Sequence, residues 1–414
     1  MPKLRFKGFT DDWEQRKLGD VVDEFYNGQT PYRQNKIYWD GDVNWLSSGD
    51  LNRGIVTHTL EKITEEGKAA SGLKIVPKGT LVIAIMGLEA AGTRGNCGIL
   101  AIDTTINQAC MALIVDGKQM SSNFLFQWYK CFGNAYALKF TQGTKQQNYN
   151  AELLADLDIS YPRLEEQMKI GEYFSTLDNL ITLHQRKCDE LQKVKKYMLQ
   201  KMFPKKGEKI PEIRFAGFFG DWEQRKLGEM FNVIDTKHAT APITWDKTRY
   251  RMIRTDCVRN GRLLSEKTDS VTEEIYEQWS ERIRLRAGDL VFTREAPMGE
   301  SAVIPSDDNL YFPGQRIVSL RPKVDADTMF INNLIYADEF RKEIYIREAG
   351  SSTVANFGIP HIKEHSVMVP DYAEQHKIGS YLNRLDNLIT FYQHKCDTLK
   401  ETKKYMLQNM FPKK

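Results

Sequence analysis

The sequence lacks paired cysteines, long apolar runs and a strong excess of either charge. Its six cysteines form no CxxC motif, so we expect reduced thiols in a cytoplasmic protein. No apolar run approaches the ~18 residues of a membrane-spanning helix, and the first residues lack the apolar segment of a signal peptide. The net charge of +3 neither requires nor excludes nucleic acid, because acidic residues elsewhere can balance a basic face.

Motifs for catalysis are also missing. The sequence contains no GxxxxGK[ST] phosphate loop. Glycines at 92, 95 and 98 have the spacing GxxGxxG, which favours a turn over a nucleotide cradle. The stretch from His361 to His365 matches HxxEH, but no third ligand is evident, so we expect no metal site. We therefore expect a chain that is not an enzyme and binds no cofactor itself.

Two long segments, 164–206 and 372–414, repeat each other. Both contain EQxKIG, LDNLIT and KKYMLQ and end in FPKK. Their apolar residues alternate spacings of four and three, which is typical of a coiled coil. The predicted seam consists of Ile170, Phe174, Leu177, Ile181, Leu191, Met198, Ile378, Leu382, Leu385, Ile389, Leu399 and Met406.

Some seam positions do not fit an apolar stripe. His184, Lys195 and Lys403 are polar; they either fix the register or mark where partner helices add to the bundle. Cys188 and Cys396 are equivalent positions, and we favour small core residues over a disulfide between them.

A second repeat opens each half of the chain. Residues 2–19 return as 211–228, both ending in DWEQRKLG with a tryptophan that we expect to be buried. The middles, about 20–160 and 229–369, differ in side chains but follow the same order of strands, loops and a helix. We therefore predict one α+β plan used twice, with two different specificities on a shared frame.

Polar loop residues in the two middles are candidates for contacts with DNA. Arginine, lysine, glutamine and asparagine read base edges, while hydroxyls and glycines permit close approach to phosphates. Each alone is more often a solvated loop residue, and the paired placement favours binding. The candidates are Arg94, Lys145, Gln146, Gln147 and Asn148 in the first middle, and Arg294, Gln315, Arg316, Ser351, Ser352 and Thr353 in the second.

The doubled DWEQRKLG segments and the doubled EQxKIG…LDNLIT helices together resemble the specificity subunit of type I restriction–modification systems. The resemblance covers nearly the whole chain. It implies two α/β target recognition domains separated by two long helices, which form an antiparallel coiled coil with pseudo-twofold symmetry. The implied segments are 1–162 and 204–370 for the recognition domains and 163–203 and 371–414 for the helices.

The resemblance also implies a function. Each recognition domain would read one half of an asymmetric, bipartite site in double-stranded DNA. Two modification (methyltransferase) subunits and the restriction (motor-nuclease) subunits would be the partners, carrying S-adenosylmethionine, ATP and magnesium, and the chain itself would have no catalysis and no membrane contact. The alternatives are a coiled-coil scaffold whose inserts bind proteins, or an enzyme in its own right, for which no motif is present.

Replacement of residues 20–160 by an unrelated insert should change one half of the recognised DNA site only, because each insert is predicted to read independently. Methylation mapping with the modification subunit present measures this. A change in both halves would contradict the modular interpretation.

Overall fold

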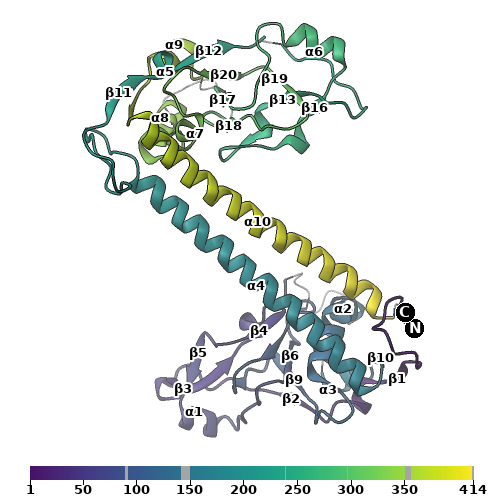
Figure 1. The fold of residues 1–414 in the computed structure, drawn as a ribbon. Coiled ribbons are helices and arrows are strands. Elements are labelled where there is room, and N and C mark those ends of the chain that lie inside the picture. Colours follow the sequence, from purple (N-terminus) through teal and green to yellow (C-terminus); the bar gives the residue numbers. More distant parts are fainter. Residues whose placement is uncertain (89–91, 141–149, 238, 296, 350–355, 413–414) are drawn as a thin grey trace. The chain divides into compact units, whose positions relative to one another are not determined.

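The computed structural model describes residues 1–412 except 89–91, 141–149, 238, 296 and 350–355. The chain forms two compact units: unit 1 comprises residues 1–185 and 394–414, and unit 2 comprises residues 186–393. Each unit therefore contains part of both long helices, α4 (Leu164–Lys201) and α10 (Tyr372–Met410) (Figure 1). The four-segment division remains a prediction, since packing groups the chain in another way.

The recognition fold of unit 1 is built on two sheets. A five-stranded sheet has the order β2-β9-β6-β7-β4, and a three-stranded sheet has the order β5-β3-β8. Neighbours are antiparallel except for β4 with β7 and β3 with β8, which are parallel. The strands are β2 (Glu24–Asn27), β3 (Trp39–Leu46), β4 (Gly54–Val56), β5 (Glu61–Ile63), β6 (Leu81–Ala84), β7 (Cys97–Leu100), β8 (Thr105–Ile106) and β9 (Cys110–Ile114).

One long helix packs on the first of these sheets. Helix α2 (Ser122–Phe140) packs on β6 and β7, as the helical spacing of Phe124, Trp128 and Phe132 predicts. The short helices α1 (Glu65–Ala70) and α3 (Ala151–Ala155) start at Thr64 and Asn150, whose side chains accept hydrogen bonds from backbone N–H groups of the first turn.

Unit 2 repeats this plan with a four-stranded sheet, β12-β20-β17-β18, a three-stranded sheet, β16-β13-β19, and a hairpin, β14-β15. The strands are β12 (Phe231–Asp235), β13 (Tyr250–Ile253), β14 (Val258–Arg259), β15 (Arg262–Leu263), β16 (Asp269–Ser270), β17 (Leu290–Thr293), β18 (Ser301–Val303), β19 (Leu310–Pro313) and β20 (Ile317–Pro322). The helices are α5 (Leu227–Met230), α6 (Glu273–Trp279), α7 (Thr328–Leu334), α8 (Asp338–Ala349) and α9 (Ile359–Glu364).

One expectation for unit 2 needs correction. By its order in the second middle, the stretch 327–350 is predicted to be one helix, as 121–140 is in the first. The described residues of this stretch form two helices, α7 and α8, with a break between them. At the break, the hydroxyl of Tyr336 hydrogen-bonds Glu300 Oε2 at 3.0 Å, so a tertiary contact in this turn competes with helix continuation.

The opening repeats have identical roles in the two units. Strand β1 (Glu14–Lys17) pairs antiparallel with β10 (Asp158–Tyr161), and β11 (Glu223–Lys226) pairs in the same way with β21 (Ser366–Val369). The preceding tryptophans, Trp13 and Trp222, are 9% and 2% exposed. Trp13 packs edge-on against Phe124 of α2, and Trp222 against Phe330 of α7, with centroid distances of 5.8 and 5.6 Å. The predicted core role of these tryptophans is confirmed.

Within each unit the long helices run antiparallel. In unit 1, Asp178 of α4 pairs with Lys403 of α10, while Gln185 accepts from the Cys396 thiol at 3.5 Å. In unit 2, the Cys188 thiol donates to Gln393 Oε1 at 3.6 Å. A rising residue number on α4 thus meets a falling number on α10. The predicted fold class is confirmed.

The predicted seam residues lie inside these units. Ile170, Phe174, Leu177, Leu399 and Met406 join the core of unit 1. Leu191, Met198, Ile378, Leu382, Leu385 and Ile389 join that of unit 2. Ile181 is half-buried, and its carbonyl accepts from Cys396.

Lys195 and Lys403 pair with aspartates of the other long helix. Lys195 Nζ lies 2.7 Å from both oxygens of Asp386, and Lys403 pairs with Asp178, the equivalent aspartate of LDNLIT. These pairs are largely buried, at 11–25% side-chain exposure, and a buried pair penalises any shift that separates its charges. They therefore fix the register of the helix pair within each unit.

The EQxKIG motif docks each long helix onto its unit. Glu374 is fully buried and accepts from Arg214 Nε and Nη2 at 2.7 Å, and Glu166 pairs likewise with Arg5. Gln375 donates to the carbonyl of Pro370 at 2.9 Å. The glycine permits close approach, because a Cβ at Gly379 would lie 2.7 Å from the Phe330 nitrogen. Of the helices in the described ranges, none is apolar and long enough to cross a membrane.

Arg214→Met should lower the free energy of unfolding of the full chain by about 3–5 kcal/mol, because it leaves the Glu374 carboxylate buried without its partner. Chemical denaturation measures the effect. Lys226→Met, which removes the exposed pair with Glu364, is the control and should cost at most about 1 kcal/mol. Equal losses in the two variants would contradict the docking role.

Candidate nucleic-acid interface

The candidate residues of unit 2 meet at the end of its four-stranded sheet. Arg294 follows β17, and Gln315 and Arg316 form the turn between β19 and β20. The Arg294 N–H donates to the Arg316 carbonyl at 3.0 Å. Arg316 has a left-handed φ of +70° and pairs through Nε with Glu295 at 3.0 Å. The fold therefore gathers these residues from separate parts of the chain.

The side chains at this edge differ in exposure. Arg316 is exposed, while Arg294 is only 8% exposed and lies 4.0 Å from Glu295. The carbonyl of Arg294 accepts from the Phe357 N–H at 2.8 Å. Arg294 is thus placed to support the loop, and Arg316 and Gln315 are placed to meet a ligand.

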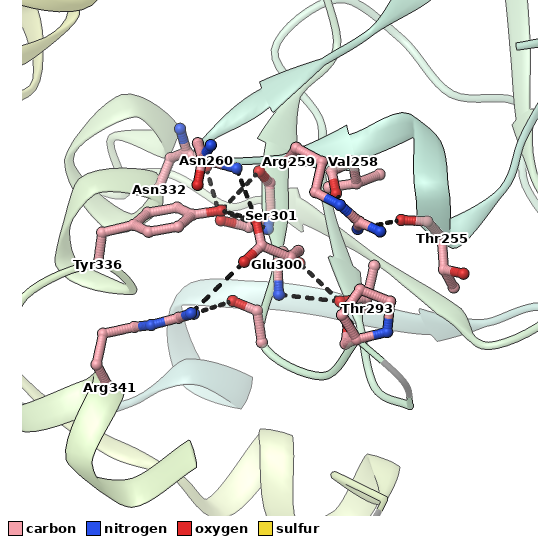
Figure 2. A network of polar contacts seen from close by, with 12 residues as sticks. Thr255, Val258, Arg259, Asn260, Thr293, Glu300, Ser301, Asn332, Tyr336 and Arg341 are labelled. Carbon is pink, nitrogen blue, oxygen red and sulfur yellow. Dashed lines mark hydrogen bonds and ion pairs between the residues drawn. The ribbon is translucent and has the colours of Figure 1, made fainter. Parts of the chain in front are cut away.

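A polar network holds the base of this loop in place (Figure 2). Glu300 accepts from the Asn260 N–H at 2.6 Å and from the Tyr336 hydroxyl at 3.0 Å. The Ser301 N–H donates to Tyr336 at 3.0 Å, and Arg341 donates to the Gly299 carbonyl at 2.7 Å. Buried polar groups that are all partnered restrict a site to one geometry. Contacts with Tyr336 and with Arg341 of α8 therefore hold the end of the loop that carries Arg294 and Glu295.

The same network changes a pKa. Burial, followed by the nearby Glu300 carboxylate, raises the pKa of Tyr336 to about 12. Tyr336 therefore remains a neutral hydroxyl donor well above physiological pH.

The remaining candidates of unit 2 and most of those of unit 1 cannot be placed. Lys145, Gln146, Gln147 and Asn148, and Ser351, Ser352 and Thr353, lie outside the described residues. Arg94 is described and half-buried in the turn between β6 and β7, where its carbonyl accepts from Arg53 Nη2 at 2.6 Å. The role of all these candidate residues in binding DNA remains a prediction.

Arg94 and Arg294 follow equivalent strands but do not occupy equivalent positions. The bond from the Arg294 N–H to the Arg316 carbonyl has its counterpart in the bond from the Ile85 N–H to the Ala109 carbonyl, at 2.9 Å. Ile85 therefore takes the place of Arg294 in unit 1.

Sequence reasoning missed the counterpart of Gln315, which is Gln108. The parallel pair Leu46–Ile106 corresponds to the pair Ile253–Pro313. The next N–H groups, of Asn107 and Gly314, donate to the carbonyls of Leu46 and Ile253. Gln315 Nε2 donates to the Thr240 hydroxyl at 3.0 Å, whereas in unit 1 the Thr30 hydroxyl donates to Gln108 Oε1. The equivalence can be found in the sequence by aligning residues 106–110 (INQAC) with residues 313–317 (PGQRI), which lead into β9 and β20.

The HxxEH stretch is used in packing. Glu364 pairs with Lys226 at 2.6 Å, and His365 lies 3.3 Å from Glu343 and packs its ring against Phe340. Burial lowers the pKa of His365. Among the described residues, no group of three metal-binding side chains gathers here or elsewhere.

Comparison with known proteins agrees with this double architecture. The sequence model of the family described as "Type I restriction modification DNA specificity domain" matches residues 10–193 and 220–401. The chain belongs to this family. Its function is therefore that of a DNA sequence-specificity subunit in a type I restriction–modification system.

Individual relatives have low sequence identity to this chain but align over long stretches of it. The type I restriction enzyme MjaVIII specificity subunit of Methanocaldococcus jannaschii is 23% identical over 408 residues, which cover 96% of this chain and 91% of the relative. The MjaIX specificity subunit of the same organism is 28% identical over 243 residues, 55% of this chain and 54% of the relative. The crystal structure of the S subunit from M. genitalium matches with a TM-score of 0.68 at 15% identity, covering 100% of this chain and 99% of that one. This last match shows the fold alone.

Tyr336→Phe should lower the free energy of unfolding near neutral pH by about 1–3 kcal/mol, because Glu300 and the Ser301 N–H each lose a buried partner. The unfolded tyrosine titrates near 10, so the wild-type contribution should disappear as pH rises from about 10 to about 12. The difference between the two proteins should therefore shrink over that window. Tyr345→Phe, at an exposed tyrosine of α8, is the control, and a pH-independent difference would argue against the network.

Proposed function

We propose that this chain reads a bipartite, asymmetric site in double-stranded DNA, with one half-site bound by the recognition sheets of each unit. The observation that carries the proposal is the repeated threonine–glutamine contact, Thr30 with Gln108 and Thr240 with Gln315. Most other side chains of the two inserts differ, yet in both a threonine from the loop after β2 or β12 contacts the glutamine that precedes β9 or β20.

The chemistry of the pair suits the reading of a base. A glutamine amide offers both a donor and an acceptor, which matches the N6 and N7 edge of adenine in the major groove. The threonine hydroxyl occupies one hydrogen of the amide nitrogen or one lone pair of the amide oxygen. The rest of the amide remains available to a ligand. Neighbouring Arg316 is exposed and suited to a guanine edge or a phosphate.

We further propose that the chain performs no chemistry itself. It would direct two modification subunits and the restriction subunits to the DNA in the cytoplasm, with S-adenosylmethionine, ATP and magnesium held by those partners. The paired helices would be their docking frame. A scaffold whose inserts bind proteins is the rival function, and sequence-specific retention of a bipartite duplex distinguishes the two.

Gln315→Ala should relax one base position in one half-site, at a cost of about 1–3 kcal/mol in discrimination. Gln108→Ala is the matched variant and should relax a position in the other half only. Methylation mapping with the partner subunits present reads out both variants. Loss of specificity in both halves from a single substitution would contradict the division of labour.

A further inference from the structure

A pocket of about 590 Å³ lies entirely within unit 1. It is bounded by α2, by α4 near Asp178 and Ile181, and by the last turns of α10. Phe132, Leu407 and Phe411 give it an apolar floor. Its size falls in the range of small-ligand pockets, roughly 300–1,000 Å³.

The rim of the pocket is strongly basic. Five cations line it and one carboxylate, that of Asp178, opposes them; the cations are Arg53, Lys130, Lys400, Lys403 and Lys404. Asp178 is shared, because Lys403 pairs with it and Lys130 Nζ lies 3.4 Å from it. One carboxylate cannot neutralise this group, so the pocket favours an anion.

The behaviour of Lys403 is consistent with an excess of positive charge. Burial, followed by the nearby Lys130 ammonium, lowers the pKa of Lys403 to about 8. An anion in the pocket would oppose both effects and favour the charged lysine.

Comparison with unit 2 shows which of these cations belong to the shared frame. In the helix repeats, Lys403 and Lys404 correspond to Lys195 and Lys196, but Lys400 corresponds to Gln192. In unit 2, Lys195 pairs with Asp386 much as Lys403 pairs with Asp178. The shared pair fixes the helices, and Lys400 is an addition of unit 1.

The other two additions come from the recognition fold. Arg53 and Asn260 both have a left-handed φ, 59° and 50°, and each precedes a glycine. Counted from the equivalent phenylalanines that pack on Trp13 and Trp222, Lys130 corresponds to Tyr336. Three of the five cations therefore differ from the residue at the corresponding position of the second copy, where Arg262 instead lies 3.9 Å from Asp386. The composition of the rim thus differs between the two copies.

The rim is continuous with the candidate DNA interface, because Arg53 Nη2 donates to the carbonyl of Arg94. We propose that the pocket binds a nucleotide unit of the DNA backbone beside the first half-site. The cations would hold its phosphate and the apolar floor would take its sugar or base. This inference rests on the proposed function and adds a backbone contact made by unit 1 alone.

The test is the salt dependence of DNA affinity, measured with the full chain and its modification subunit on a mixed-sequence duplex. The double variant Arg53→Asn with Lys400→Gln installs the residues of the second copy, which the fold already accepts. The slope of log affinity against log salt should fall by about 1 for each lost contact, about 2 in total. The control, Lys193→Gln with Lys206→Gln, removes two exposed lysines outside the pocket and should leave the slope unchanged.

An unchanged slope in the double variant, or an equal fall in the control, would overturn the inference while leaving the proposed function intact. A wild-type complex that does not bind DNA would overturn both. Pyrophosphate titration of the full chain and of the double variant distinguishes a DNA phosphate from a free anion. If the double variant loses pyrophosphate binding but keeps the salt dependence of DNA affinity, the pocket serves a free anion and the DNA assignment is wrong. Loss of the modification subunit at an unchanged slope would identify an acidic protein segment as the occupant, which also overturns the inference.

Discussion

The buried arginine–glutamate pair at the start of each long helix is the constraint on which the two units depend. Glu166 and Glu374 have side chains that are 1% and 0% exposed, and each is held by an arginine from the opening repeat. A carboxylate in such a position is stable only with its partner. The opening segment, the recognition fold and the long helix must therefore assemble together in each unit.

The rest of EQxKIG sets the geometry of this joint. The glutamine bonds the proline carbonyl that ends the recognition fold and the N–H that precedes its main helix. The glycine allows that helix to approach at a distance no side chain permits. Because the hydrogen bonds of this glutamine to each insert are made with backbone groups, the loops of each insert can change without disturbing the joint. Gln108 and Arg316 thus occupy equivalent turns of differing composition.

Sequence periodicity was sufficient to predict the frame. The 3.5-residue repeat predicts α4 and α10, and short apolar runs at 79–87 and 109–115 predict β6 and β9, because these signals are local. The partners of Lys195 and Lys403 were not predictable from the same pattern, since each is an aspartate on the other helix. Nor was the break between α7 and α8, where Tyr336 joins a network with residues 35 positions away.

The site was harder to predict than the frame. Gln315 and Arg316 follow a Pro-Gly turn and were visible, but Gln108 was overlooked, because its equivalence depends on the parallel pairing of β3 with β8. Arg94 and Arg294 looked paired in sequence, yet the hydrogen bond from Ile85 shows that they are not equivalent. Loop spacing in a sequence does not preserve register, whereas strand pairing does.

The most direct test of the account is methylation mapping of DNA from cells that express this chain with its modification subunit. Two independent readers on one frame predict a single methylated motif in two parts, separated by a fixed gap of unspecified bases. A contiguous motif, or no motif that depends on this chain, would contradict the account.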